Sequence, residues 1–124
     1  MEEFSCKTRI ISGPGACGAL ASMGARRLFL VTDPFFVKNG TAKRIVELTN
    51  CQESEVFDKI QPDPTVELAA EGTARLRAFE PDLLVALGGG SAMDCAKAMA
   101  FFAKGSYKLV AIPTTSGSGS EVTD

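Results

Sequence analysis

The sequence predicts an α/β fold in which a mostly parallel sheet carries helices on both of its faces. Apolar runs alternate with segments of helical periodicity in five successive strand-and-helix steps, without hairpin signals between them. Two of the runs, residues 28–31 and 83–87, are continuously apolar, as is typical of strands buried on both sides. We therefore expect residues 1–124 to form a single α/β domain.

The first half of the chain contains three predicted strands, separated by turn signals and short helices. Gly13-Pro14-Gly15 is a turn signal, Gly24 suits the C-cap of a short helix, and Asp33-Pro34 ends the second strand. The predicted elements are strands over residues 4–11, 27–32 and 53–60 and helices over residues 16–24 and 40–49.

The second half contains the clearest periodic patterns. After Pro62-Asp63-Pro64, which closes the third strand, Thr65 can cap a helix that extends through residue 79. A strand over residues 83–87 follows, then an amphipathic helix from Ser91 to about residue 102 and a last strand over residues 107–112. The order of these elements favours a parallel arrangement of the strands.

Composition excludes several classes of protein. The 124 residues are 45% hydrophobic and 23% charged, which is ordinary for a globular domain. A net charge of −2, with no basic cluster larger than Arg26-Arg27, argues against a nucleic-acid partner. No run approaches the ~18 apolar residues that span a membrane. The acidic start, Met1-Glu2-Glu3, has no secretory pattern, so a cytoplasmic location is expected.

Cysteine and histidine usage limits the chemistry. The four cysteines lack C-x-x-C spacing and are interpreted as small buried hydrophobic residues rather than as disulfide partners or metal ligands. The chain contains no histidine. It therefore lacks the commonest metal ligand and the commonest general base.

A glycine-rich turn follows the strand at residues 83–87 and leads into a helix at Ser91. Backbone N–H groups in the first turn of a helix bind anions, and glycines let a phosphate approach the backbone closely. Gly88, Gly89, Gly90 and Ser91 thus indicate a phosphate site. The alternative is purely structural, because Ser91 and Asp94 have the spacing of a capping box.

A second loop rich in glycine and hydroxyl groups follows the last predicted strand. Residues 113–123 read PTTSGSGSEVT. A flexible linker can have such a composition. However, ligands of open α/β sheets bind at the carboxyl ends of the strands. Two such loops, each directly after a strand, indicate two walls of one polyanion site.

These two loops resemble the signatures of a known family. Residues 88–97, GGGSAMDCAK, resemble the Gly-Gly-Gly-Ser-x-x-Asp-x-Ala-Lys motif of the iron-containing, or metal-dependent, alcohol dehydrogenases. Residues 113–123 resemble the family's Pro-Thr-Thr-x-Gly-Thr-Gly-Ser-Glu-Val-Thr loop, with Ser118 in place of the usual threonine and Ser116 in place of a frequent alanine. The resemblance extends over all 124 residues.

The resemblance implies a Rossmann-like domain that binds NAD. Gly89, Gly90 and Ser91 are expected to hold the pyrophosphate, while Asp33 is expected beside the adenosine ribose. A carboxylate there accepts hydrogen bonds from the ribose and repels the extra phosphate of NADP. The alternative for Asp33 is a turn-forming role before Pro34. The residues expected along the path from adenine to nicotinamide are Thr114, Thr115, Ser118 and Thr123.

The resemblance also implies what this chain lacks. Family members hold a divalent metal, iron or zinc, with one Asp and three His in a C-terminal helical domain, and a chain without histidine cannot contain that site. We expect the N-terminal part of a longer enzyme that interconverts small alcohols and aldehydes, with the 124 residues inactive alone. The alternatives are a member resembling glycerol dehydrogenase or dehydroquinate synthase, or a free-standing nucleotide-binding module. The strand at residues 4–11 offers an edge for pairing, so a homodimer or larger assembly is expected.

Overall fold

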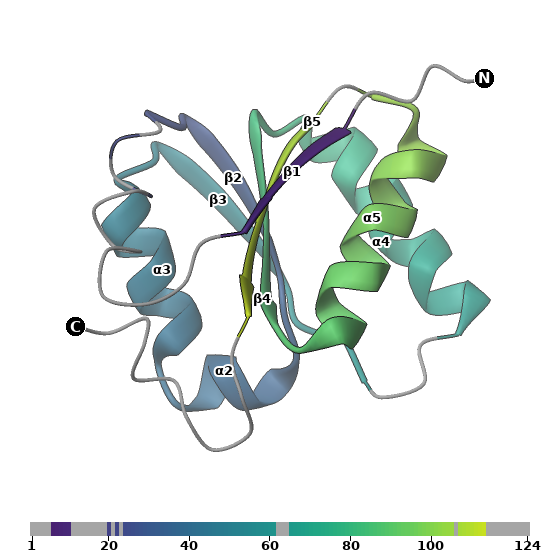
Figure 1. Cartoon of the computed structure of the whole chain (residues 1–124), viewed down its shortest axis with the longest axis horizontal. Helices are drawn as coiled ribbons and strands as arrows, with labels where there is room; N and C mark the ends of the chain where they lie inside the picture. Colours follow the sequence, from purple (N-terminus) through teal and green to yellow (C-terminus); the bar gives the residue numbers. More distant parts are fainter. Residues whose placement is uncertain are drawn as a thin grey trace.

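The computed structural model contains one five-stranded sheet with the strand order β1-β5-β4-β2-β3 (Figure 1). It describes residues 6–10, 20, 22, 24–61, 65–105 and 107–113, with only the backbone for residues 6–10. All neighbouring strands are parallel, which confirms the predicted fold class. The strands are β1 (Cys6–Ile10), β2 (Arg27–Val31), β3 (Glu53–Phe57), β4 (Leu83–Gly88) and β5 (Tyr107–Pro113).

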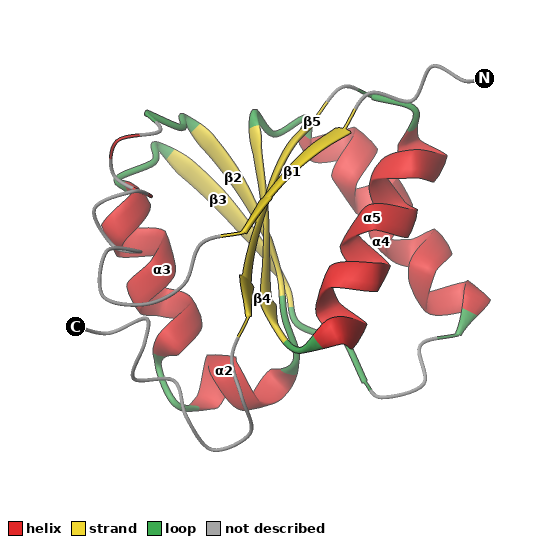
Figure 2. Ribbon diagram, viewed as in Figure 1, coloured by secondary structure: helices red, strands yellow, loops and turns green. Residues whose placement is uncertain are grey.

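Helices cover both faces of the sheet (Figure 2). The short α2 (Pro34–Lys38) and α3 (Thr41–Thr49) lie on one face, while α4 (Val66–Phe79) and α5 (Gly90–Ala103) lie on the other (Figure 2). The side chains of the inner strands β2 and β4 alternate between two apolar cores. Leu28 and Leu30 belong to the core on the α3 side, whereas Phe29 and Val31 belong to the core on the α5 side.

Position in the sheet explains which strands are apolar throughout. β4 lies inside the sheet between β5 and β2, and all six of its residues are buried. β3 lies at one edge, and only Phe57 among its five residues is fully buried. An edge strand faces water along one side, so charged residues such as Glu53 are tolerated there.

The predicted helix after residue 65 is confirmed in detail. The Thr65 hydroxyl oxygen accepts a hydrogen bond from the Leu68 N–H at 3.1 Å and caps α4. The helix ends at Glu80, which has a positive φ of 54°. Gly72 in the middle of α4 is buried against Met99 of α5, so the two helices approach closely at this point.

Some predicted boundaries are wrong by a few residues, and one helix was missed. The predicted turn at Asp33-Pro34 begins helix α2, because Asp33 is its N-cap and Pro34 its first residue. The third strand ends at Phe57 rather than at residue 60, and the helix predicted from Ser91 begins at Gly90. Gly40 is the N-cap of α3 rather than part of it.

Other predictions lie wholly or mostly outside the described residues. These are the turns at residues 13–15 and 62–64, the glycine-rich loop after Pro113, and most of the helix at residues 16–24. Leu20 and Ser22 are helical, and Leu20 is buried in the core on the α3 side. Gly24 has a positive φ of 64°, the conformation expected of a helix-ending glycine.

Candidate functional site

A cleft of about 820 Å³ lies at the carboxyl edge of the sheet. Its walls are the segments that directly follow three neighbouring strands. After β2 the chain turns to α2 and α3 on one face of the sheet, whereas after β4 it turns to α5 on the other face. Such a reversal between neighbouring strands is where open α/β sheets bind ligands. The lining residues are Asp33 to Phe35 after β2, Asp58 to Gln61 after β3 and Gly89 to Ala92 after β4.

The glycines after β4 make the first turn of α5 accessible. Gly88 has a positive φ of 133°, which lets the chain leave the strand sharply. Gly89 is the N-cap of α5, and no side chain makes a capping hydrogen bond there. A Cβ atom added at Gly89 or Gly90 would meet no atom within 4 Å. The first turn of α5 therefore faces open space beside an uncapped backbone.

The capping-box interpretation of Ser91 and Asp94 is wrong. Ser91 is the second residue of α5 rather than its N-cap, and Asp94 lies beyond the first turn. The physical reason is the turn at Gly88, after which the extended Gly89 starts the helix before Ser91. Because the N-terminus of α5 lacks a side-chain cap, its dipole and N–H groups suit an anionic group.

The position of Asp33 is compatible with both roles that the sequence left open, and only the structural one is observed. Its Oδ1 atom accepts hydrogen bonds from the N–H groups of Phe35 at 2.9 Å and Phe36 at 3.4 Å. The carboxylate therefore caps α2, as the structural alternative requires. It also lines the cleft opposite Gly89 and Gly90, in the arrangement that the ligand role requires. The two roles are compatible because both capping bonds use Oδ1.

The third wall of the cleft was missed in the sequence. The prediction extended the strand to residue 60, although the strand ends at Phe57 and the following residues line the cleft. Two backbone hydrogen bonds hold this wall beside β2, from Thr32 N–H to the Phe57 carbonyl at 3.0 Å and from Ile60 N–H to the Thr32 carbonyl at 3.3 Å. The charged residues Asp58 and Lys59 directly after Phe57 were the available signal.

A smaller hollow of about 300 Å³ lies on the other side of the glycine turn. Gly88 of β4 is paired in register with Pro113 of β5, so the loops after these strands begin side by side. This adjacency is what the two-wall prediction requires. Thr114, Thr115, Ser118 and Thr123 lie outside the described residues, and their roles stay predictions. The hollow is lined by Ala86, Gly88 to Gly90, Met93 and Ala111 to Pro113.

Other groups bear on metal, thiol and membrane chemistry. Within the described ranges, no three His, Cys, Asp or Glu side chains gather as a metal site would require. Cys95 is buried in α5 and Cys51 is half-buried, and burial raises the pKa of both thiols. No helix in the described part of the chain has both the length and the apolar character needed to cross a membrane.

Comparison with known proteins gives one consistent result. A family model described as iron-containing alcohol dehydrogenase matches residues 7–124. A 1-propanol dehydrogenase of Salmonella typhimurium is 38% identical over 130 residues, which cover 99% of this chain and 35% of that protein. The chain thus spans about a third of the length of the two 1-propanol dehydrogenases that it matches.

Solved structures agree with the sequence comparison. An iron-containing alcohol dehydrogenase from Thermotoga maritima is similar with a TM-score of 0.71 and 30% identity, over 98% of this chain and 40% of that one. A sulfoacetaldehyde reductase from Bifidobacterium kashiwanohense, solved in complex with NAD⁺, has a TM-score of 0.71 and 28% identity, over 98% of this chain and 38% of that one.

Proposed function

The chain belongs to the iron-containing alcohol dehydrogenase family, and from this premise we propose that it is the NAD-binding part of an alcohol dehydrogenase. The complete enzyme would interconvert a small alcohol and its aldehyde, and NAD⁺ would accept the hydride or NADH would donate it. The observation that carries the proposal is the uncapped N-terminus of α5, where Gly89 and Gly90 leave open space beside the backbone.

The cleft supports specific roles for its residues. Gly89, Gly90 and Ser91 would hold the cofactor pyrophosphate through backbone N–H groups in the first turn of α5. Thr114, Thr115, Ser118 and Thr123 would continue the site toward the nicotinamide, since their loop begins beside the glycine turn. The NAD⁺ complex of the similar sulfoacetaldehyde reductase supports this choice of cofactor.

Asp33 would select NAD over NADP, because its carboxylate accepts from ribose hydroxyls and repels a 2′-phosphate. The test separates this role from capping. Asp33→Asn keeps an oxygen that can cap α2 and removes the charge, while Asp33→Gly removes both. In both variants the preference for NAD⁺ over NADP⁺ should decrease or reverse. The measured quantity is the ratio of the two affinities, obtained by NMR titration. An unchanged ratio in both would leave Asp33 as a capping residue only.

The metal chemistry would lie outside these residues. In the complete enzyme, iron or zinc would polarise the substrate oxygen, and the chain has no histidine to hold such a metal. We therefore expect the 124-residue chain to bind NAD⁺ weakly, with a dissociation constant of about a millimolar, and to catalyse nothing. Alcohol-dependent NADH formation is assayed with added Fe²⁺ or Zn²⁺. Metal-stimulated turnover that persists through repurification would contradict the proposal.

A second copy of the chain is the proposed partner. β1 lies at one end of the sheet and pairs with β5 on one side only, among the described strands. Exposed strand edges pair readily with another chain. We expect a homodimer or larger assembly, and light scattering over a range of concentrations measures it. A monomer mass at every concentration would contradict this proposal and leave the cofactor site untouched.

A further inference from the structure

Lys59 lies at the rim of the cleft, where its positive charge can affect the choice between NAD and NADP. Val31 of β2 and Phe57 of β3 are paired in register, and Asp33 and Lys59 each follow two residues later. Neighbouring strands lie ~4.8 Å apart, so the segments that contain these two residues start from adjacent positions at the carboxyl edge of the sheet. The hydrogen bond from Ile60 N–H to the Thr32 carbonyl holds the segment after β3 beside the segment after β2. Both residues line the cleft.

The charge of Lys59 is engaged by a residue outside the cleft. Its Nζ atom pairs with Oε2 of Glu71, which lies on α4 and is absent from the lining residues of the cleft. The two side chains are 50% and 43% exposed. Exposed pairs of this kind are weak and are screened by salt. The pair directs the Lys59 ammonium group toward α4, and because the pair is weak, an anion bound in the cleft competes with Glu71 for it.

The balance of charge at this rim disfavours an additional phosphate. Asp33 and Asp58 are the acidic side chains that line the cleft, and Lys59 is the basic one among the described lining residues. With Glu71 included, three carboxylates oppose one ammonium group. Sites that accept NADP place a basic side chain near the ribose 2′-phosphate. Here the candidate base is present, but Glu71 neutralises it.

We propose that Glu71 is a positioning residue for cofactor specificity: it holds Lys59 away from the ribose end of the cleft and so reinforces the choice of NAD over NADP. This inference rests on the proposed NAD-binding function. Glu71 acts through Lys59 and touches no cofactor itself. Removal of its charge frees Lys59 to pair with the 2′-phosphate of NADP, whereas NAD lacks that phosphate and its pyrophosphate would be held by the first turn of α5.

The experiment is a titration of the 124-residue chain with NAD⁺ and with NADP⁺, followed by NMR so that millimolar binding is measurable. In Glu71→Gln, NADP⁺ affinity should rise about three- to fivefold, while NAD⁺ affinity changes less than about twofold. The gain should disappear in the double variant Lys59→Gln with Glu71→Gln. It should also shrink in about 1 M salt, where the Debye length is ~3 Å.

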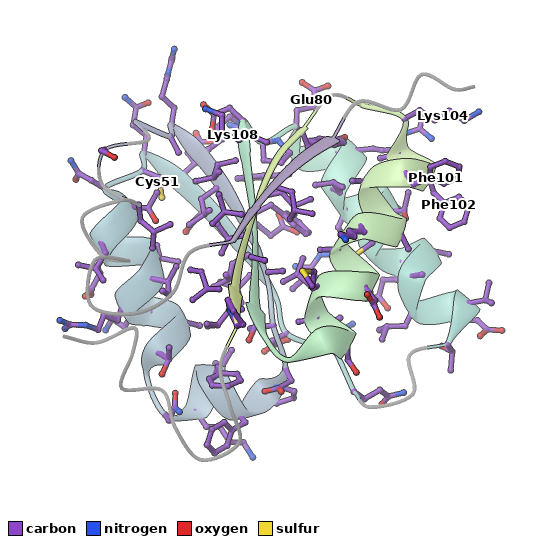
Figure 3. The ribbon with its side chains drawn as sticks, in the orientation of Figure 1. Cys51, Glu80, Phe101, Phe102, Lys104 and Lys108 are labelled. Carbon is purple, nitrogen blue, oxygen red and sulfur yellow. The ribbon has the colours of Figure 1, made fainter. Side chains whose placement is uncertain are left out.

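Glu80→Gln is the matched control, because it makes the same change of charge at the far end of α4. Glu80 is labelled in Figure 3 and follows the last residue of that helix, before β4 begins, so it lies at the amino edge of the sheet. It should leave both affinities unchanged. An equal rise of NADP⁺ affinity in Glu80→Gln, or none in Glu71→Gln while NAD⁺ still binds, would overturn the inference alone. Failure of the unmodified chain to bind either nucleotide would overturn the proposed function and the inference together.

Discussion

Glycines serve opposite purposes in two regions of this domain. In the contact between α4 and α5, a Cβ atom added at Gly72 would lie 2.6 Å from the sulfur of Met99. In the cleft, a Cβ atom added at Gly89 or Gly90 would meet nothing within 4 Å. At Gly72, the Met99 side chain already occupies the space that a Cβ atom would take, so a larger residue would have to displace it. Gly89 and Gly90, in contrast, lie beside space that no protein atom occupies.

This difference separates stability from binding. The α4–α5 contact belongs to the core that covers one face of the sheet, and Met99 within it is fully buried. Gly89 and Gly90 of the glycine turn are exposed where β4 passes into α5. Substitutions in the first region should therefore change the free energy of unfolding, whereas substitutions in the second should change ligand affinity. Four measurements examine this comparison.

The largest effect is expected for Gly72→Val. The added methyl groups overlap the buried Met99 side chain, and overpacking of this kind costs about 1–3 kcal/mol. A β-branched side chain recovers only part of the helix-propensity cost of glycine. Urea denaturation should show a loss of about 2 kcal/mol in the free energy of unfolding. Ala70→Val, at an exposed position of the same helix, should change stability by less than about 0.5 kcal/mol. Equal effects at the two sites would refute tight packing at Gly72.

Gly90→Val should give the reverse result. The new side chain enters the open space of the cleft and displaces the phosphate, so NAD⁺ affinity should fall about tenfold or more, equivalent to ~1.4 kcal/mol. The free energy of unfolding should stay within about 0.5 kcal/mol of the original. NMR titration and urea denaturation of the same sample measure both quantities. Normal NAD⁺ binding by a folded Gly90→Val chain would show that the phosphate does not bind at the N-terminus of α5.

Thr32→Val examines the boundary between the two regions. The buried Thr32 hydroxyl donates to the Leu87 carbonyl at 2.9 Å and joins the ends of β2 and β4 beneath the cleft. Its removal leaves that buried carbonyl without this partner, which should cost about 1 kcal/mol of stability. Thr73→Val is the control, because the Thr73 hydroxyl bonds only to Ala69 within its own helix. A larger loss in the control would exclude this role for Thr32.

The smallest effect concerns thiol reactivity. Cys95 lies in the packed region, with its sulfur 3.7 Å from that of Met99, and burial raises the pKa of its thiol. Iodoacetamide should modify Cys95 more slowly than the half-buried Cys51 at pH 7.5, as peptide mass spectrometry can resolve. Because the folded-state pKa is raised, unfolding exposes a more acidic thiol, and stability should decline above about pH 8.5. Faster modification of Cys95 than of Cys51 would contradict tight packing around it.

Local sequence patterns were sufficient for most elements of the fold. The continuous apolar run of β4 indicated a strand buried on both faces, and Thr65 marked the start of α4. The glycine turn before α5 and the acid after β2 pointed to residues that the fold brings into one cleft. These features depend on backbone preferences and on burial, which neighbouring residues in the chain determine.

Other features depend on which segments meet, and local sequence does not specify those contacts. The strand order placed Lys59 beside Asp33, and the packing of α4 on the sheet brought Glu71 to that lysine. The packing importance of Gly72 likewise arises only because Met99 of α5 lies against it. The sequence by itself therefore determined most of the elements and the glycine turn, but not helix α2. The tertiary structure decided the third wall of the cleft and its charge balance, because both arise from residues that are distant along the chain.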